Sequence, residues 1–282
     1  MSVDIEVKDL WKSFSHEGGK ALPVFEGIDM TVDRHEFIAL VGPSGCGKTT
    51  LLNLIAGFDA PDRGTITVDG VEVRGPTPKG IMITQKGSVF PWLSAWRNLT
   101  FVLTGMSEAE KKKRAHHYID LVGLHDFGKS FPYQLSGGML QRLELARALV
   151  VKPEVLYMDE PFGALDALTR LRMRQELLRI RREEPQTTVL VTHDVDEAIA
   201  LADRIFVLSE RPMRIKRIVE INIEHPRSMT DLRAVACKDS ILRQLGVLPD
   251  DGSGDITDPD VQTGAAALDF AINQQMVESL PL

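Results

Sequence analysis

A glycine-rich segment between an apolar strand pattern and a helix pattern constrains this chain more than any other feature. Residues 42–50 read GPSGCGKTT and follow the apolar run FIALV at 37–41. Glycines let the backbone curl so that its N–H groups point at phosphate oxygens, and the dipole of the following helix adds positive potential there. In this pattern Lys48 reaches the terminal phosphates and the Thr49 hydroxyl ligates Mg²⁺. The sequence therefore predicts a nucleotide phosphate site formed by Gly42, Pro43, Ser44, Gly45, Cys46, Gly47, Lys48, Thr49 and Thr50.

Length and composition indicate a cytosolic protein. The 282 residues allow one or two domains. No apolar run approaches the roughly 20 residues that span a bilayer, and the N-terminus lacks the basic start and apolar segment of a signal peptide. The two cysteines, Cys46 and Cys237, give no disulfide framework.

The net charge of −7 is carried by the C-terminal segment. Residues 250–282 hold seven acidic side chains and no Lys or Arg, which leaves 33 acidic and 33 basic residues in 1–249. A neutral body argues against a protein that binds nucleic acid through bulk charge. We interpret 249–282 as an acidic extension, with a Gly-, Pro- and Asp-rich linker up to residue 264 and a candidate short docking helix over 265–277.

Polar side chains follow three apolar strand patterns. The apolar run 155–158 is followed directly by Asp159 and Glu160. Asp159 suits the second coordination shell of Mg²⁺, and Glu160 suits polarising a water for attack on the γ-phosphate. His193 follows 188–192 and is placed to bond the γ-phosphate, although a lone His there is more often structural. Gln85 follows 81–84 and offers an amide oxygen to Mg²⁺ or the attacking water, although strand-end glutamines usually meet solvent.

Two further features fit a nucleotide site. Phe14 lies upstream of the phosphate loop and is the better candidate for stacking on a purine ring, with Trp11 second; the alternative is an aromatic packed in a small sheet. Ser136, Gly137 and Gly138 precede a helix pattern over 137–150, with Ser136 as N-cap and bare glycine N–H groups. The sequence thus has a second helix start that suits phosphate.

Residues 90–150 interrupt the strand patterns with helix patterns at about 94–104, 107–123 and 137–150. We interpret this block as a helical subdomain inserted in an α/β core. Its loop 90–93, FPWL, is apolar and predicted to be exposed, as in patches that dock a partner. The basic run 111–114 is expected to be a solvated helix face rather than a nucleic-acid site, and the basic helix expected over 167–184 is likewise predicted to be solvated.

Six elements in a fixed order resemble the ATP-binding subunit of an ABC transporter. They are the Walker A loop GPSGCGKTT, the Q-loop at Gln85, the signature LSGGM at 135–139, the Walker B strand VLYMDEP at 155–161, the D-loop GALD at 163–166 and the switch histidine in VTHD at 191–194. The resemblance covers about residues 3–248. It implies an ABC ATP-binding domain over 1–248, with a RecA-like P-loop core, an antiparallel β-subdomain and a helical subdomain at about 90–152.

The resemblance also implies a role for each matching residue, with ATP and Mg²⁺ as ligands. Phe14 is similar to the aromatic that stacks on the base, and Gly42 to Thr50 would hold phosphate and Mg²⁺. Ser136, Gly137 and Gly138 would cap the γ-phosphate bound to the opposite subunit of a head-to-tail dimer. The remaining matches are Lys48 and Gln85 in catalysis, Asp159 as the Walker B aspartate, Glu160 as catalytic glutamate, Asp166 as dimer-coupling aspartate and His193 as switch histidine.

Finer features are similar to importers of the nitrate, sulfonate and taurine group. They are the segment VFPWLSAWRNL, the signature LSGGM and the ending RPMRI…EHPR. This resemblance implies a membrane permease as partner, a second ATP-binding subunit (identical or a paralogue), an external solute-binding protein and a place at the cytoplasmic face of the cell membrane. Two departures are Leu140, where that group more often has Gln, and the acidic extension.

Other classes explain less of the sequence. A soluble ABC ATPase of DNA repair would carry a long coiled coil between Gln85 and Ser136, which here are 51 positions apart, and one that acts on ribosomes would carry two cassettes. A small-molecule P-loop kinase does not explain LSGGM. A non-enzymatic binding module has no use for Glu160 and His193.

Overall fold

The chain contains two β-sheets, and side chains from both sheets pack together in one hydrophobic core. The computed structural model describes residues 5–15, 21–84, 88–163 and 165–249. Gln85, Ala164 and the acidic extension from residue 250 onward lie outside these ranges, so the predictions made for them stay predictions.

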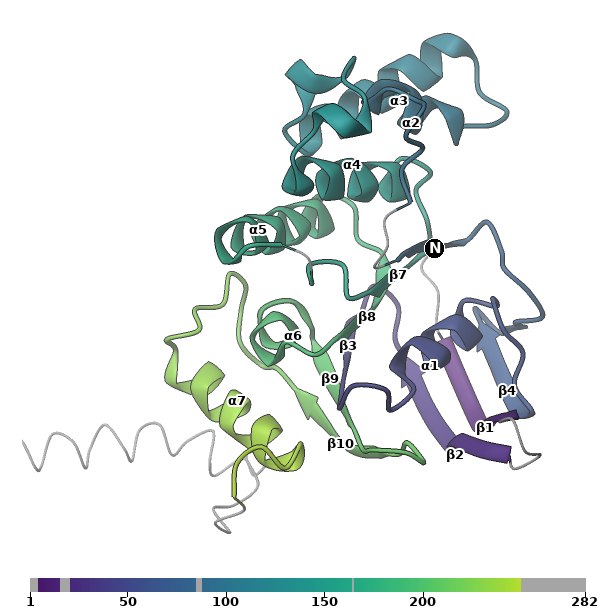
Figure 1. Cartoon of the computed structure of the whole chain (residues 1–282), viewed down its shortest axis with the longest axis vertical. Helices are drawn as coiled ribbons and strands as arrows, with labels where there is room; N and C mark the ends of the chain where they lie inside the picture. Colours follow the sequence, from purple (N-terminus) through teal and green to yellow (C-terminus); the bar gives the residue numbers. More distant parts are fainter. Residues whose placement is uncertain (1–4, 16–20, 85–87, 164, 250–282) are drawn as a thin grey trace, which may run out of the picture.

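A six-stranded sheet forms the centre of the molecule (Figure 1). Five of its strands run parallel, and only the edge strand β10 is antiparallel to its neighbour β9. Strands in such a sheet are covered on both faces and therefore read as unbroken apolar runs. In spatial order they are β10 (Ile215–Glu220), β9 (Arg204–Leu208), β3 (Phe37–Val41), β8 (Thr187–Thr192), β7 (Val155–Asp159) and β6 (Gly80–Ile83).

Alternate residues of these strands enter two different cores, as the period of two in a strand requires. In β3, Ala39 faces the first core and Leu40 the second. The first core receives the helices α2 to α7, and the second receives α1 (Lys48–Ile55) and the four-stranded sheet. The predicted α/β layering is therefore confirmed.

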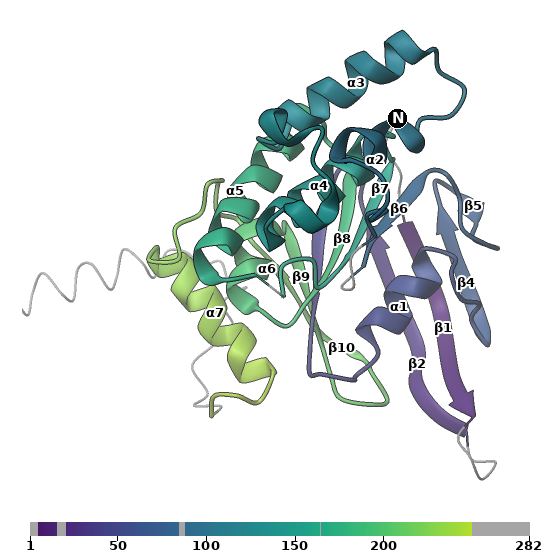
Figure 2. The ribbon, with the colours of Figure 1, turned by 45° about the horizontal axis from the view of Figure 1, so that its top comes forward.

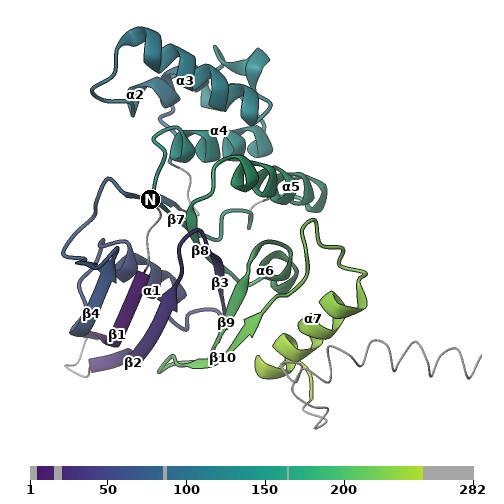
Figure 3. The same cartoon turned by 180° about the vertical axis from the view of Figure 1, so that it is seen from behind.

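The smaller sheet is antiparallel and lies beside α1, at the opposite side of the molecule from α7 (Figures 2 and 3). A hairpin turns at Asp69 and Gly70, both of which adopt positive φ, which is the conformation that an Asp-Gly hairpin turn requires. The spatial order of its strands is β2 (Ala21–Val32), β1 (Ile5–Ser15), β4 (Arg63–Val68) and β5 (Val71–Glu72).

The helical subdomain stands above the central sheet, away from the small sheet (Figure 1). It contains α2 (Ala95–Phe101), α3 (Glu108–Leu121), the 3₁₀ turns η1 (His125–Phe127) and η2 (Pro132–Gln134), and α4 (Gly137–Leu149). The helices α5 (Ala167–Glu183), α6 (Val195–Leu201) and α7 (Leu232–Gln244) complete the cover of the sheet. None of the helices in the described ranges has both the length and the apolar character needed to cross a bilayer.

Candidate nucleotide-binding and catalytic site

The phosphate loop joins β3 to α1 and has the backbone that its glycines allow. Gly45 and Gly47 adopt φ of 74° and 124°, a region that other residues rarely enter. A Cβ on Gly47 would also lie 2.4 Å from Val24 Cγ1 of β2. Ser44, Gly45 and Thr49 are exposed, whereas Cys46 and Lys48 are buried. The loop therefore presents an open face above a packed base.

Lys48 is the cation at the centre of this loop. Its Nζ donates hydrogen bonds to the carbonyl oxygens of Gly42, at 2.7 Å, and Pro43, at 2.8 Å. These bonds satisfy the ammonium group although only 6% of the residue is exposed. The charge is thus held inside the curl of the loop, where a phosphate group would benefit from it.

Thr49 and Asp159 form an oxygen-rich pair beside Lys48. Thr49 Oγ1 donates to Asp159 Oδ1 at 3.1 Å, although they are 110 positions apart. Burial raises the pKa of Asp159, and so does the charge of Glu160, while Thr49 and Lys48 favour its ionised form. Hydroxyl and carboxylate oxygens are the ligands that Mg²⁺ prefers, so the pair fits the predicted metal position. Gln85, the third predicted ligand, lies outside the described residues.

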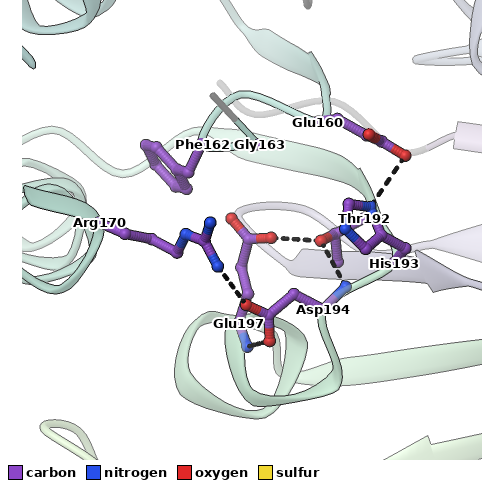
Figure 4. Close-up of a pocket in the computed structure, with 8 residues that line it drawn as sticks. All are labelled: Glu160, Phe162, Gly163, Arg170, Thr192, His193, Asp194 and Glu197. Atoms are coloured by element: carbon purple, nitrogen blue, oxygen red, sulfur yellow. Dashed lines mark hydrogen bonds and ion pairs between the residues drawn. The ribbon is translucent and has the colours of Figure 1, made fainter. Parts of the chain in front are cut away.

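Glu160 and His193 meet at the carboxyl ends of two neighbouring strands (Figure 4). Glu160 Oε1 lies 3.2 Å from His193 Nδ1, and the Glu160 N–H donates to the carbonyl of Val191 at 2.9 Å. Glu160 has a φ of 46°, a strained conformation for a residue with a Cβ and one that is concentrated at functional sites. The structure therefore brings together the two residues predicted to act on the γ-phosphate.

Ser136 caps α4 as predicted. Its Oγ accepts a hydrogen bond from the Met139 N–H at 3.3 Å, and Ser136 and Gly137 are exposed. A Cβ on Gly138 would lie 2.5 Å from Thr169 Cγ2 in the first turn of α5. Ser136 belongs to the helical subdomain, whereas Lys48 lies at the start of α1 between the two sheets (Figure 1). Its predicted contact with a nucleotide on a second subunit stays a prediction.

Asp166 is the N-cap of α5. Its Oδ1 accepts a hydrogen bond from the Thr169 N–H at 3.0 Å, and this bond lowers the pKa of the carboxyl. The residue is otherwise exposed.

The two aromatic candidates differ in their surroundings. The Trp11 indole N–H donates to Asp9 Oδ1 at 2.6 Å, and Arg63 lies 5.6 Å from the ring centroid. Phe14 is 46% exposed, and it pairs with Leu22 of β2, the strand whose Val24 abuts the phosphate loop. The Trp11 side chain is therefore held within the small sheet by these contacts, and Phe14 remains the candidate for stacking on a base.

Several residues that hold this site were missed by reasoning from the sequence. Arg174 of α5 is only 7% exposed, although its helix was predicted to be solvated, and that prediction is wrong for this face. Arg174 and Arg170 both bind Asp194, the residue after His193. The i, i+4 spacing of the two arginines places them on one helix face and was the available signal.

A phosphate loop, a carboxylate pair at a strand end and a separate helical subdomain together define a P-loop ATPase. Residues 25–163 match the family described as ABC transporter. The chain belongs to the ABC transporter family of ATP-binding proteins, whose cassettes are ATPases, and the resemblance inferred from the motifs is confirmed.

Curated relatives match almost the whole described part of the chain. It is 44% identical over 247 residues to the uncharacterized ABC transporter ATP-binding protein MJ0412 of Methanocaldococcus jannaschii, covering 87% of this chain and 92% of that protein. It is 44% identical to the nitrate import ATP-binding protein NrtD of Synechocystis, covering 80% and 87%. It is 38% identical to the aliphatic sulfonates import ATP-binding protein SsuB of Bacillus thuringiensis, covering 86% and 95%.

One group of relatives is longer. The bicarbonate transport ATP-binding protein CmpC of Synechococcus elongatus is 43% identical over 237 residues, which are 82% of this chain but 36% of that protein. Among solved structures, a dimeric post-hydrolysis state of the ATP-binding cassette MJ0796 bound to ADP and Pi has a TM-score of 0.68 and 29% identity, covering 78% of this chain and all of that one. The predicted ABC ATPase fold is therefore confirmed.

Proposed function

We propose that this chain is the ATP-hydrolysing subunit of an importer for a small oxyanion, bound to a permease at the cytoplasmic face of the cell membrane. Glu160 placed against His193 at the edge beside the phosphate loop is the observation that carries the catalytic part. Relatives named for nitrate and sulfonate import support the oxyanion class, which also includes bicarbonate, and give no support to a role on DNA or ribosomes. An external solute-binding protein belongs to the same proposal.

In the proposed reaction the phosphate loop holds the triphosphate of ATP through its N–H groups and Lys48. Thr49 would ligate Mg²⁺ and Asp159 would hold its waters; the ion supplies charge neutralisation for the transferred phosphoryl group. Glu160 orients and polarises the attacking water, and His193 bonds the γ-phosphate and holds Glu160. Gln85 is proposed to sense the metal.

The proposed active form is a head-to-tail dimer, of two copies or of this chain and a paralogue. Ser136 and Gly137 are exposed at the start of α4, and they lie in the helical subdomain rather than beside Lys48. In the dimer, the N–H groups of these residues would contact the γ-phosphate of the ATP bound to the second subunit. The dimeric cassette structures of MJ0796 support a dimer. ATP binding would close the dimer and hydrolysis would open it, a shift between two populated states.

An aromatic cluster on the helical subdomain is proposed to receive a cytoplasmic helix of the permease. Phe90 lies 5.5 Å from Trp92 and 5.1 Å from Phe101 between ring centroids. Trp92 and Phe101 are 70% and 64% exposed, so the cluster offers a large apolar surface to a partner.

The loop that carries Phe90 and Trp92 is tied to the signature helix. Arg147 of α4 lies 4.6 Å from the Phe90 ring centroid and donates to the Ser88 carbonyl, while Glu144 of α4 accepts from the Ser88 N–H. Movement of α4 on closure of the dimer would therefore move the proposed docking loop with it.

The catalytic part is tested with Glu160→Gln, which keeps the shape of the side chain and removes its negative charge. We expect ATP turnover to fall by about 100-fold or more while ATP-dependent dimers accumulate. Glu108→Gln, at an exposed position of α3, is the matched control and is expected to behave as wild type. Turnover of Glu160→Gln within about tenfold of wild type would overturn its assignment.

The transport part is tested by purifying the tagged chain from gently solubilised native membranes and identifying its partners by mass spectrometry. We expect a polytopic permease, and cells lacking the chain should lose uptake of nitrate, a sulfonate or bicarbonate. Recovery only with ribosomes or DNA-repair proteins would contradict the importer while leaving the ATP site intact.

A further inference from the structure

A charge network lies next to the Glu160–His193 pair, and Figure 4 shows its members Arg170, Asp194 and Glu197. Its centre is Asp194, whose Oδ2 accepts from Arg174 Nη2 at 2.7 Å and from Arg170 Nη1 at 3.2 Å. The Arg174 side chain is 8% exposed and that of Asp194 is 23% exposed, so little water screens this pair. Two ion pairs therefore fasten α5 to the residue that follows the switch histidine.

The network fixes the backbone on both sides of His193. The Asp194 N–H donates to Thr192 Oγ1 at 3.0 Å, and Asp194 Oδ1 accepts from the Glu197 N–H at 3.0 Å as the N-cap of α6. The Thr192 hydroxyl in turn bonds the buried carboxylate of Glu197. The His193 side chain itself is 60% exposed, so its orientation depends on its contact with Glu160 and on this held backbone.

Arg170 extends the network to the segment before α5. Its Nη2 donates to the carbonyl of Leu165 at 3.1 Å while its Nη1 holds Asp194. Leu165 directly precedes Asp166, the exposed N-cap of the helix. The guanidinium group of Arg170 thus bridges Leu165 in the D-loop and Asp194 next to the switch histidine, and we call this pair of hydrogen bonds the Arg170 fork. A planar, rigid guanidinium transmits a displacement better than a single flexible amine would.

We propose that Arg170 and Asp194 are positioning residues for His193. A displacement of residues 165–166 reaches the switch histidine through the Arg170 fork, and His193 faces Glu160 only while the fork is intact. This link rests on the proposed function in one respect, because contact with a second subunit at Asp166 is what would displace the segment. The relay within the chain stands on the contacts alone.

Three variants separate this role from simple structural support. Arg170→Met keeps the length of the side chain and removes both hydrogen bonds of the fork. Asp194→Asn keeps an oxygen that accepts from the Glu197 N–H, so the cap of α6 survives while both ion pairs lose their charge. Arg172→Met lies on the same helix at an exposed position and is the matched control.

The first measurement is the imidazole NMR signal of His193 in the full chain, assigned through His193→Gln. We expect Arg170→Met and Asp194→Asn to move this signal in the same direction, because both release His193 from Glu160. An effect of charge alone would have opposite signs, since one variant removes a positive group and the other a negative one. Opposite shifts, no shift, or an equal shift in Arg172→Met would overturn the proposal.

The second measurement is steady-state ATP hydrolysis. We expect Arg170→Met and Asp194→Asn to lower kcat by about tenfold with KM for ATP within about twofold of wild type, because ATP binding does not use the fork. A loss seen only in KM, or one of less than about twofold in kcat, would also overturn the proposal. If the wild-type chain hydrolyses no ATP, the proposed function fails, and the NMR signal still decides whether the relay exists.

Discussion

Glu197 is the residue whose titration the structure perturbs most clearly near neutral pH. It is 3% exposed, and burial raises the pKa of its carboxyl to about 7 despite the hydrogen bond from Thr192 and the nearby charges of Arg174 and Arg170. Asp194 adds to the rise. Between the ordinary pKa of 4.5 and about 7, the folded state thus holds a proton that the unfolded chain has released. The contribution of Glu197 to the free energy of unfolding is therefore fully present below pH 4.5 and is lost as the pH rises through about 7.

We predict that Glu197→Gln flattens this part of the stability profile. Relative to wild type, the free energy of unfolding of the variant should rise between about pH 5 and pH 8, by at most a few kcal/mol, because the amide has no proton to lose. Urea denaturation at a series of pH values measures it. A constant difference between the two proteins across that range would contradict the prediction.

Local motifs point to the candidate reacting residues, whereas the residues that hold them are far apart in the sequence and could not be found there. Lys48, Thr49, Asp159 and Glu160 each stand at a strand end or helix start that the hydrophobic pattern marks. Asp194 could not be paired from the sequence, because Arg174 is 20 positions away and only the packing of α5 on the sheet brings the two together.

At the level of secondary structure, the loop between β6 and α2 is held by hydrogen bonds to one buried side-chain amide. Asn98 of α2 has no exposed surface. Its Oδ1 accepts from the Phe90 N–H at 2.8 Å, and its Nδ2 donates to carbonyl oxygens of residues 90, 93 and 94 at 3.0 to 3.1 Å. The side chain thus replaces the secondary structure that the loop lacks.

We predict that Asn98→Leu, which keeps the branching of the side chain at Cγ, lowers the free energy of unfolding by about 2–4 kcal/mol because buried backbone groups lose their partners. Hydrogen exchange of the Phe90 amide should become faster by at least tenfold on the same grounds, about 1.4 kcal/mol of lost protection. Arg97→Ala, exposed on the same helix, is the control and should change neither quantity. Unchanged exchange at Phe90 in Asn98→Leu would show that the loop is held by its aromatic contacts instead.

Strand lengths show the same limit of sequence reasoning. In the second strand of the small sheet the sequence pattern indicates a strand only over 28–32, but β2 begins at Ala21. Its pairing with β1 has register shifts between Val7 and Ser13, and such irregularities break the alternation by which a half-buried strand is recognised. Four strands of the central sheet, β3, β6, β7 and β8, were predicted to within a residue or two because an apolar run needs no alternation.

At the level of the whole molecule, the net charge and the described hydrophobic core belong to different segments of the chain. The core of the described residues lies within 5–249. The net charge of −7 is carried by 250–282, since the body holds 33 residues of each sign. Stability comes from buried contacts, whereas solubility depends on net charge. A chain that ends at residue 249 would have a formal net charge of zero at pH 7, with His neutral.

We therefore predict that truncation after residue 249 leaves the thermal unfolding midpoint within about 2 °C of the full chain, because no part of the described core is removed. The truncated protein should have a lower solubility limit near pH 7, and this difference should shrink at about pH 10, where part of the lysine charge is lost and the body becomes net negative. Calorimetry and ultracentrifugation of the soluble fraction measure the two effects. A midpoint lowered by about 5 °C or more would show instead that 250–282 packs on the body, and an equal loss of solubility at both pH values would argue against charge as its cause.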